Sequence, residues 1–140
     1  MSIDISTLEV GQVVAGGEFP LNRGSLVRYA GASGDFNDIH YRDDIAVSVG
    51  LPGVLAHGML TMGVAVQPVI DWIGDPGKVL DYGVRFTRPV LVDATEGALV
   101  TVSAKIGVLN AEANTARVDL TVTAADTTVL GKAQVVVSLA

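Results

Sequence analysis

Apolar and polar positions alternate along most of the second half of the chain. Three runs there are rich in Val and Thr: Ala98 to Leu109, Thr115 to Thr123 and Val129 to Leu139. Such β-branched runs with a period of two are typical of strands. Short polar segments separate them, at residues 110–114 and 124–128. The pattern therefore predicts three sequential strands in an antiparallel meander.

Two further segments have strand-like patterns. Val10 to Leu21 is predicted to be extended, with a turn at Gly16-Gly17, and Val79 to Val92 shows the same alternation as the later runs. Loops rich in glycine and proline lie between these segments and the helical patterns, at residues 50–53 and 74–77.

Helical spacing of apolar residues occurs in the first half of the chain. Asn22 can cap a helix over roughly Arg23 to Ala32, and Asp43-Asp44 can open a short helix from Ile45 to Val49. The longest candidate runs from Gly58 to about Ile73 and is apolar on most of its faces. A helix of this kind in a water-soluble protein is expected to be buried nearly all round.

The simplest architecture that satisfies these patterns is α+β, with one curved antiparallel sheet wrapped around one central helix. A length of 140 residues predicts a single domain over residues 1–140, with one hydrophobic core. Pro68 falls inside the central helix, where it removes one hydrogen bond, and it predicts a kink over residues 64–68.

Composition narrows the class of protein. Hydrophobic residues make up 49% of the chain, but no apolar run approaches the ~18 residues of a membrane span. The first residues lack the basic and apolar regions of a secretory signal, so a cytoplasmic protein is expected. The absence of cysteine excludes disulfides, thiol nucleophiles and thiolate metal sites.

The net charge of −6 argues against nucleic acid as a partner, because phosphate contacts require basic clusters. The nine Lys and Arg residues are scattered, apart from Arg85 and Arg88. That pair is either a local contact for an acidic or phosphorylated ligand or two solvated residues of a strand.

The chemistry-bearing residues gather in two short segments. Asp35 and His40 lie five residues apart, and the second histidine, His57, follows His40 by seventeen residues and precedes Gly58. On one helix the first two would point about 140° apart, but on a turn after Gly34 they can converge. An acid, an imidazole and a backbone donor at a helix start are the parts needed to move protons beside a carbonyl. The alternative is structural: Asp35 ends the preceding helix and His40 is a hydrogen-bonded loop residue.

Two motifs carry a family resemblance. The segments are Ser33-Gly34-Asp35-Phe36-Asn37-Asp38-Ile39-His40 and Ala56-His57-Gly58-Met59-Leu60. Together they resemble the hydratase 2 signature of the MaoC-like (R)-specific enoyl-thioester hydratases and dehydratases, which have the hot-dog fold. The resemblance covers roughly residues 20 to 90 and is strongest to the catalytic B-type subunit of mycobacterial (3R)-hydroxyacyl-carrier-protein dehydratases.

The resemblance implies a role for each residue. Asp35 and His40 would be the catalytic dyad, with His40 handling the C2 proton and Asp35 the hydroxyl or water. The backbone N–H of Gly58 would bind the thioester oxygen as an oxyanion hole. Asn37 matches the signature asparagine and would hold the turn or the dyad. His57 is interpreted as structural, orienting the loop before Gly58, because the dyad already supplies a base. No metal or redox cofactor is implied.

The resemblance also implies partners. The substrate would be an acyl-CoA or acyl-carrier-protein thioester, and the chain would form a homodimer or a heterodimer with a related hot-dog subunit. The segment Arg85-Phe86-Thr87 resembles a family strand near the dimer interface and is interpreted as architecture.

Two alternative functions remain. One is a non-catalytic hot-dog subunit that contributes acyl-chain binding, and the other is a thioesterase. Thioesterases of this fold typically carry a carboxylate on the central helix, where the only acid, Asp71, lies at the far end. One departure from the family bears on activity: Asp38 replaces the usual proline of D-x-N-P-x-H. Its carboxylate would either influence His40 or point to solvent.

Overall fold

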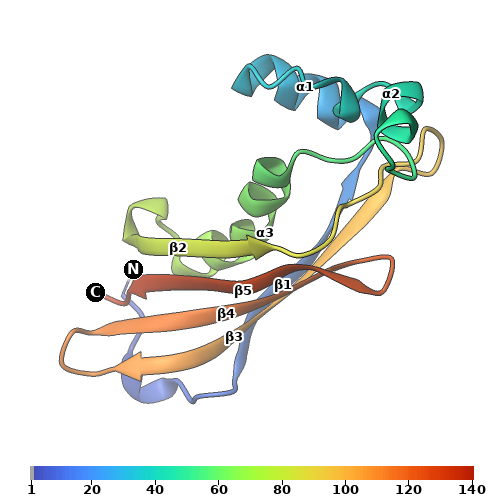
Figure 1. Cartoon of the computed structure of the whole chain (residues 1–140). Helices are drawn as coiled ribbons and strands as arrows, with labels where there is room; N and C mark the ends of the chain where they lie inside the picture. The colour runs from blue at the N-terminus through green and yellow to red at the C-terminus, as the bar shows by residue number, and fades with distance from the viewer. Residues whose placement is uncertain (1) are drawn as a thin grey trace.

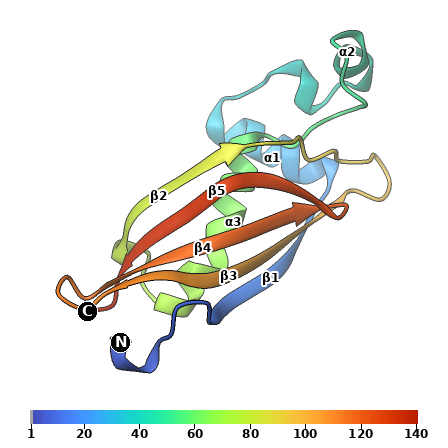
Figure 2. The same cartoon turned by 60° about the horizontal axis from the view of Figure 1, so that its bottom comes forward.

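A computed structural model of the chain describes residues 2–140. It contains one antiparallel sheet that curves around a helix (Figure 1). Figure 2 shows the strands side by side, in the order β1-β3-β4-β5-β2. The strands are β1 (Val13–Leu21), β2 (Val79–Phe86), β3 (Ala98–Asn110), β4 (Thr115–Ala124) and β5 (Thr127–Ser138).

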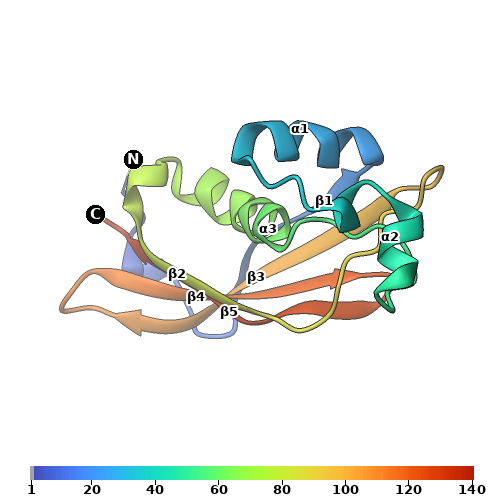
Figure 3. The same ribbon diagram turned by 45° about the horizontal axis from the view of Figure 1, so that its top comes forward.

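The helices lie on the concave side of this sheet. Helix α3 (Gly58–Ile73) contacts all five strands, and Figure 3 shows α1 (Arg23–Ser33) stacked above it, with α2 (Asp43–Ser48) at one end. Short 3-10 turns η1 to η3 occupy Ile5–Thr7, Asp38–His40 and Pro76–Lys78. The predicted α+β class, with a curved sheet around a central helix, is confirmed.

The meander of β3, β4 and β5 follows from its alternating pattern. Every second residue of β3 from Val100 to Ile106 is buried, and β4 alternates in the same way. In β5 the alternation is regular from Ala133 onward. Valine, alanine and leucine supply most of the buried core. The three predicted strands are therefore confirmed, and each pairs with its neighbour in sequence.

Helix α3 is less buried than its composition predicts. Met59, Gly63, Gln67 and Asp71 are exposed, and their spacing of four residues places them on one face. The prediction of burial all round is thus wrong for a single chain, because nothing within residues 2–140 covers this face. The helix continues without a break through the buried Pro68, and the expected kink stays a prediction.

The predicted turn at Gly16-Gly17 is wrong, because both glycines lie within β1. A Cβ atom on Gly16 would lie 2.8 Å from the carbonyl oxygen of Val102 on β3. A Cβ atom on Gly17 would lie 3.2 Å from the ring of Phe19. At this point the glycines allow close approach rather than a change of direction.

The predicted strand from Val79 to Val92 is also too long, since the sheet pairing of β2 ends at Phe86. Pro89 cannot donate to a ladder, and beyond it the chain pairs with another segment. The Ala56 N–H donates to the Val90 carbonyl at 2.8 Å, and the Val92 N–H donates to the Val54 carbonyl at 3.0 Å. This pairing fixes residues 54–56, which lead directly into α3.

The two ends of the described chain lie side by side (Figure 1), where the Ile3 N–H donates to the Leu139 carbonyl at 3.0 Å. Among residues 2–140, no helix is both long enough and apolar enough to cross a membrane.

Candidate active site

The turn from Asp35 to His40 is built by local hydrogen bonds. Helix α1 ends at Gly34, whose φ of 78° is left-handed. The Asn37 N–H then donates to Asp35 Oδ1 at 3.2 Å, and Asn37 Oδ1 accepts from the Ile39 N–H at 3.2 Å. The amide of Asn37 thus caps η2, and one oxygen of Asp35 is committed to the turn.

His40 is buried at the end of this turn. Its Nδ1 lies 2.8 Å from the carbonyl oxygen of Leu55. Because a carbonyl oxygen can only accept, Nδ1 carries the proton of the neutral ring. The other nitrogen, Nε2, lies 3.9 Å from Asp35 Oδ2. His40 therefore presents Nε2, the nitrogen that can gain or lose a proton, to a half-exposed carboxylate.

His57 joins the two members of this pair. It is 2% exposed, and its Nε2 donates to the backbone carbonyl of Asp35 at 3.1 Å. Its ring stacks on that of His40, with centroids 3.8 Å apart and an interplanar angle of 21°. The ring of Tyr29 on α1 packs edge-on against the His57 ring, with the two centroids 4.8 Å apart. Within residues 2–140, Nδ1 of His57 is buried without a hydrogen-bond partner.

Asp35, His40 and His57 each place a possible metal-ligating atom within 4.8 Å of the others. The lone pairs of imidazole nitrogens lie in the ring planes, and the two rings are stacked nearly parallel. Such lone pairs do not converge on one ion, as zinc coordination at about 2.0 Å would require. The arrangement suits proton transfer better than chelation.

Gly58 is the first residue of α3. The N–H groups of a first helical turn have no acceptor within the helix, and the helix dipole makes this end attractive to negative charge. A Cβ atom on Gly58 would lie 2.9 Å from Cε1 of Phe86. A side chain at this position would therefore require the Phe86 ring to move.

A cavity of about 290 Å³ opens beside these residues. Its lining includes His40, Gly58 and Thr61, together with Phe86 and Arg88. The sequence interpretation of Phe86 and Thr87 as architecture alone is incomplete, since both form the cavity wall. Only the packing of the end of β2 against the start of α3 reveals this role.

A second, almost wholly apolar cleft of about 240 Å³ meets His40 from the side of α1. Leu26, Val27 and Ala30 of the helix line it together with Phe36 and Tyr41. His40 thus lines both the cavity and the cleft, and the start of α3 lines the cavity.

Asp38, which stands in the place of the family proline, is engaged away from the dyad. Its Oδ1 accepts a hydrogen bond from the Tyr41 hydroxyl at 2.5 Å, and Oδ2 lies 3.8 Å from Nη1 of Arg42. The hydrogen bond to Asp38 raises the pKa of Tyr41 above its ordinary value. Of the two expectations for Asp38, these contacts favour the one in which its carboxylate faces away from His40.

Comparison with known proteins identifies the family of the chain. Residues 7–124 match the family described as MaoC like domain. The chain belongs to this family. A 73-residue stretch is 40% identical to 3-hydroxyacyl-thioester dehydratase X of Mycobacterium tuberculosis. The match covers 52% of this MaoC-like chain but only 25% of that dehydratase.

Solved structures of other proteins have the same fold as this chain. A MaoC-like dehydratase superposes with a TM-score of 0.95 at 39% identity, over 99% of this chain and 43% of that one. The (R)-hydratase from A. caviae involved in PHA biosynthesis superposes with a TM-score of 0.83 at 23% identity. The latter match covers 96% of this chain and 98% of the hydratase, and shows a common hot-dog fold.

Proposed function

We propose that this chain is an (R)-specific enoyl-thioester hydratase, a hydro-lyase that also runs in reverse as a (3R)-hydroxyacyl-thioester dehydratase. The observation that carries the proposal is the convergence of three groups. His40 and Gly58 line one cavity, and the carboxylate of Asp35 lies 3.9 Å from His40 Nε2. Family membership supports the same reaction class.

Water addition assigns one task to each group. The ionised Asp35 takes a proton from water as the water oxygen bonds to C3, and the protonated Nε2 of His40 gives a proton to C2. Electron density that moves onto the thioester oxygen is stabilised by the N–H of Gly58. Transfer of the proton between Asp35 and His40 restores the starting state. Dehydration follows the same steps in reverse.

The acyl group would arrive as a thioester of coenzyme A or of acyl carrier protein, as in fatty-acid elongation. Arg88 lines the cavity, and its guanidinium makes no hydrogen bond or ion pair with other residues in the range 2–140, although its backbone N–H donates to the Val129 carbonyl. Both carriers bear phosphate, for which a free guanidinium is a suitable partner. Because the chain has a net charge of −6, it repels phosphate overall, and a local cation would help to hold the carrier at the cavity.

A related subunit is part of the proposal. Strand β2 pairs only with β5 among the described strands, so its other edge is open, and Leu80 on this strand is exposed. The uncovered face of α3 carries the exposed apolar side chain of Met59 beside Gly63, and it is a second surface that a partner could cover. Open edges and apolar faces are typical of surfaces that pair. We infer a homodimer or a heterodimer with a homologous hot-dog chain.

The geometry does not favour thioester hydrolysis by a carboxylate on α3. Asp71 lies thirteen residues after Gly58, which along a helix corresponds to about 20 Å. The cavity lies at the opposite end of the helix, around Gly58 and Thr61.

The test is incubation of the purified chain with trans-but-2-enoyl-CoA. The proposal predicts loss of the conjugated enoyl absorbance, no release of free thiol, and a product with the R configuration at C3. Free thiol in proportion to substrate loss would identify a thioesterase. Inactivity, both alone and with a homologous hot-dog subunit, would identify the non-catalytic alternative.

A further inference from the structure

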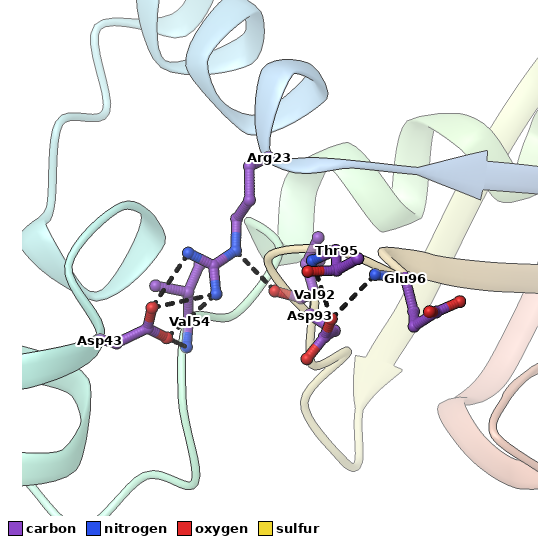
Figure 4. Close-up of polar contacts among 7 residues, drawn as sticks. All are labelled: Arg23, Asp43, Val54, Val92, Asp93, Thr95 and Glu96. Carbon is purple, nitrogen blue, oxygen red and sulfur yellow. Dashed lines mark hydrogen bonds and ion pairs between the residues drawn. The ribbon is translucent and has the colours of Figure 1, made fainter.

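A charged pair away from the cavity connects four segments of the chain (Figure 4). Arg23, at the start of α1, binds the carboxylate of Asp43 at the start of α2 through two nitrogens, with N–O distances of 3.0 and 3.1 Å. Its Nε also donates to the Val92 carbonyl at 2.6 Å. Asp43 in turn accepts the Val54 N–H at 3.1 Å.

Both backbone groups held by this pair are on buried residues. Val54 and Val92 are each 1% exposed, and they already share one hydrogen bond with each other. Among residues 2–140, Asp43 accepts the Val54 N–H and Arg23 donates to the Val92 carbonyl, so the pair satisfies both backbone groups. The hydrogen bond from Arg23 also lowers the pKa of Asp43, which keeps it charged.

The pair reaches the dyad through residues 54–56. The carbonyl of Leu55, next to Val54, accepts from His40 Nδ1, and the Leu55 N–H donates to the Ile39 carbonyl at 3.1 Å. Two residues further along, the chain enters α3 through His57 and Gly58. Asp43 itself lies three residues after His40. The same carboxylate therefore borders both chain segments that supply the site.

We propose that Arg23 and Asp43 are positioning residues that set the relative placement of His40 and Gly58. This inference rests on the proposed function, because positioning is measured by its effect on water addition. The pair fixes Val54 against Val92, which sets where the Leu55 carbonyl meets His40 and where α3 begins. Loss of the pair allows residues 54–56 to shift, and a small shift of a reacting group lowers turnover strongly.

A positioning role and a merely stabilising role of the Arg23–Asp43 pair affect different measured quantities. The Arg117–Asp119 pair on β4 is a matched control, since it also uses two guanidinium nitrogens, at 2.8 and 3.0 Å, but joins residues of one strand. A pair that only adds stability would change the unfolding midpoint and leave the kcat of the folded protein unaltered. Positioning of His40 and Gly58 changes kcat at full folding.

The experiment compares Arg23→Gln, Asp43→Asn and their double variant with Arg117→Gln. Hydration of trans-but-2-enoyl-CoA is measured where circular dichroism shows each protein fully folded. We expect Arg23→Gln to lower kcat about tenfold or more, with KM changed less than threefold. The double variant should lose little beyond Arg23→Gln, because both changes break one unit. Arg117→Gln should retain the kcat of the unaltered chain.

Equal kcat values for folded Arg23→Gln and Arg117→Gln would overturn the proposal. A readout without catalysis separates this inference from the proposed function. The His40 Nδ1 proton, hydrogen-bonded to Leu55, should give a shifted NMR signal that Arg23→Gln moves and Arg117→Gln does not. If the chain hydrates no thioester but this signal still moves, the proposed function fails and the positioning of His40 stands. If neither variant moves it, the positioning inference fails.

Discussion

At the scale of single residues, the site depends on how hydrogen bonds divide the two nitrogens of each histidine. Leu55 holds Nδ1 of His40 and thereby leaves Nε2 for Asp35. The backbone of Asp35 holds Nε2 of His57, whose ring supports that of His40. Three side chains that come from two separate motifs are thus joined by backbone carbonyls, which do not depend on the identity of neighbouring side chains.

The replacement of the family proline by Asp38 is expected to be tolerated. Asp38 is the first residue of η2, a position where the fixed φ of proline suits the start of a helix. We predict that Asp38→Pro keeps hydration activity within about twofold and changes stability by less than ~1 kcal/mol, since the entropy gain offsets the lost Tyr41 contact. Enzyme assays and urea unfolding test this. A tenfold change in activity would show that the carboxylate acts on the dyad.

At the scale of helices and strands, features that neighbouring residues determine could be predicted from the sequence, whereas features that depend on packing between distant segments could not. The helix starts at Arg23 and Gly58 follow from an asparagine cap and a glycine-led apolar run, and the turn of Asp35 and His40 lies within six residues. Phe86 was not predicted in the cavity wall, because its place depends on packing between β2 and α3, which are distant in sequence.

The glycines of β1 and the Arg23–Asp43 pair were missed for the same reason. A glycine pair inside an apolar run indicates either a turn or a close approach, and only the carbonyl of Val102 on β3 decides between them. Arg23 and Asp43 look like ordinary helix-terminal charges in the sequence. Their shared role appears only once Val54 and Val92 are paired beside them.

The contact between β2 and α3 predicts a response to alkaline pH. The Tyr82 hydroxyl donates to the Met62 carbonyl at 2.6 Å, and burial raises the pKa of Tyr82 to about 12. Since this pKa lies above the unfolded value near 10, the contribution of Tyr82 to stability is complete below pH 10 and is lost as the pH rises from about 10 to about 12. Tyr82→Phe should destabilise the protein by about 0.5–1.5 kcal/mol at pH 8.

The measurement is urea unfolding of both proteins at pH 8 and pH 11. The difference in stability between them should shrink or reverse at pH 11, because phenylalanine does not ionise. An unchanged difference would show that Tyr82 does not titrate with folding.

At the scale of the whole molecule, the cavity opens where β2 ends and α3 begins, so the proposed site adjoins the open edge of the sheet. The ring of Phe86 at the end of β2 lies so near Gly58 at the start of α3 that a Cβ atom on Gly58 would be 2.9 Å from it. Surfaces at the β2 edge and along α3 are uncovered in the single chain. A second hot-dog subunit on this side would cover them and lie beside the cavity.

This proposed interface predicts a difference between the two edges of the sheet. Leu80 on β2 is 58% exposed and Val13 on the opposite edge strand β1 is 60% exposed. We expect Leu80→Arg to weaken association of the chain, alone or with its homologous partner, at least tenfold, since it places a charge in an apolar contact. Val13→Arg should leave association unchanged. Sedimentation that showed the reverse order would place the interface on β1.

We propose that Asp35 and His40 add water to an enoyl thioester. The most direct test is the rate of hydration of trans-but-2-enoyl-CoA by the intact chain, by Asp35→Asn and by His40→Ala, each shown to be folded. We expect hydration by the intact chain and a fall of about 10²-fold or more in kcat for each variant. A folded variant of either residue that hydrated the substrate at the rate of the intact chain would contradict the proposal.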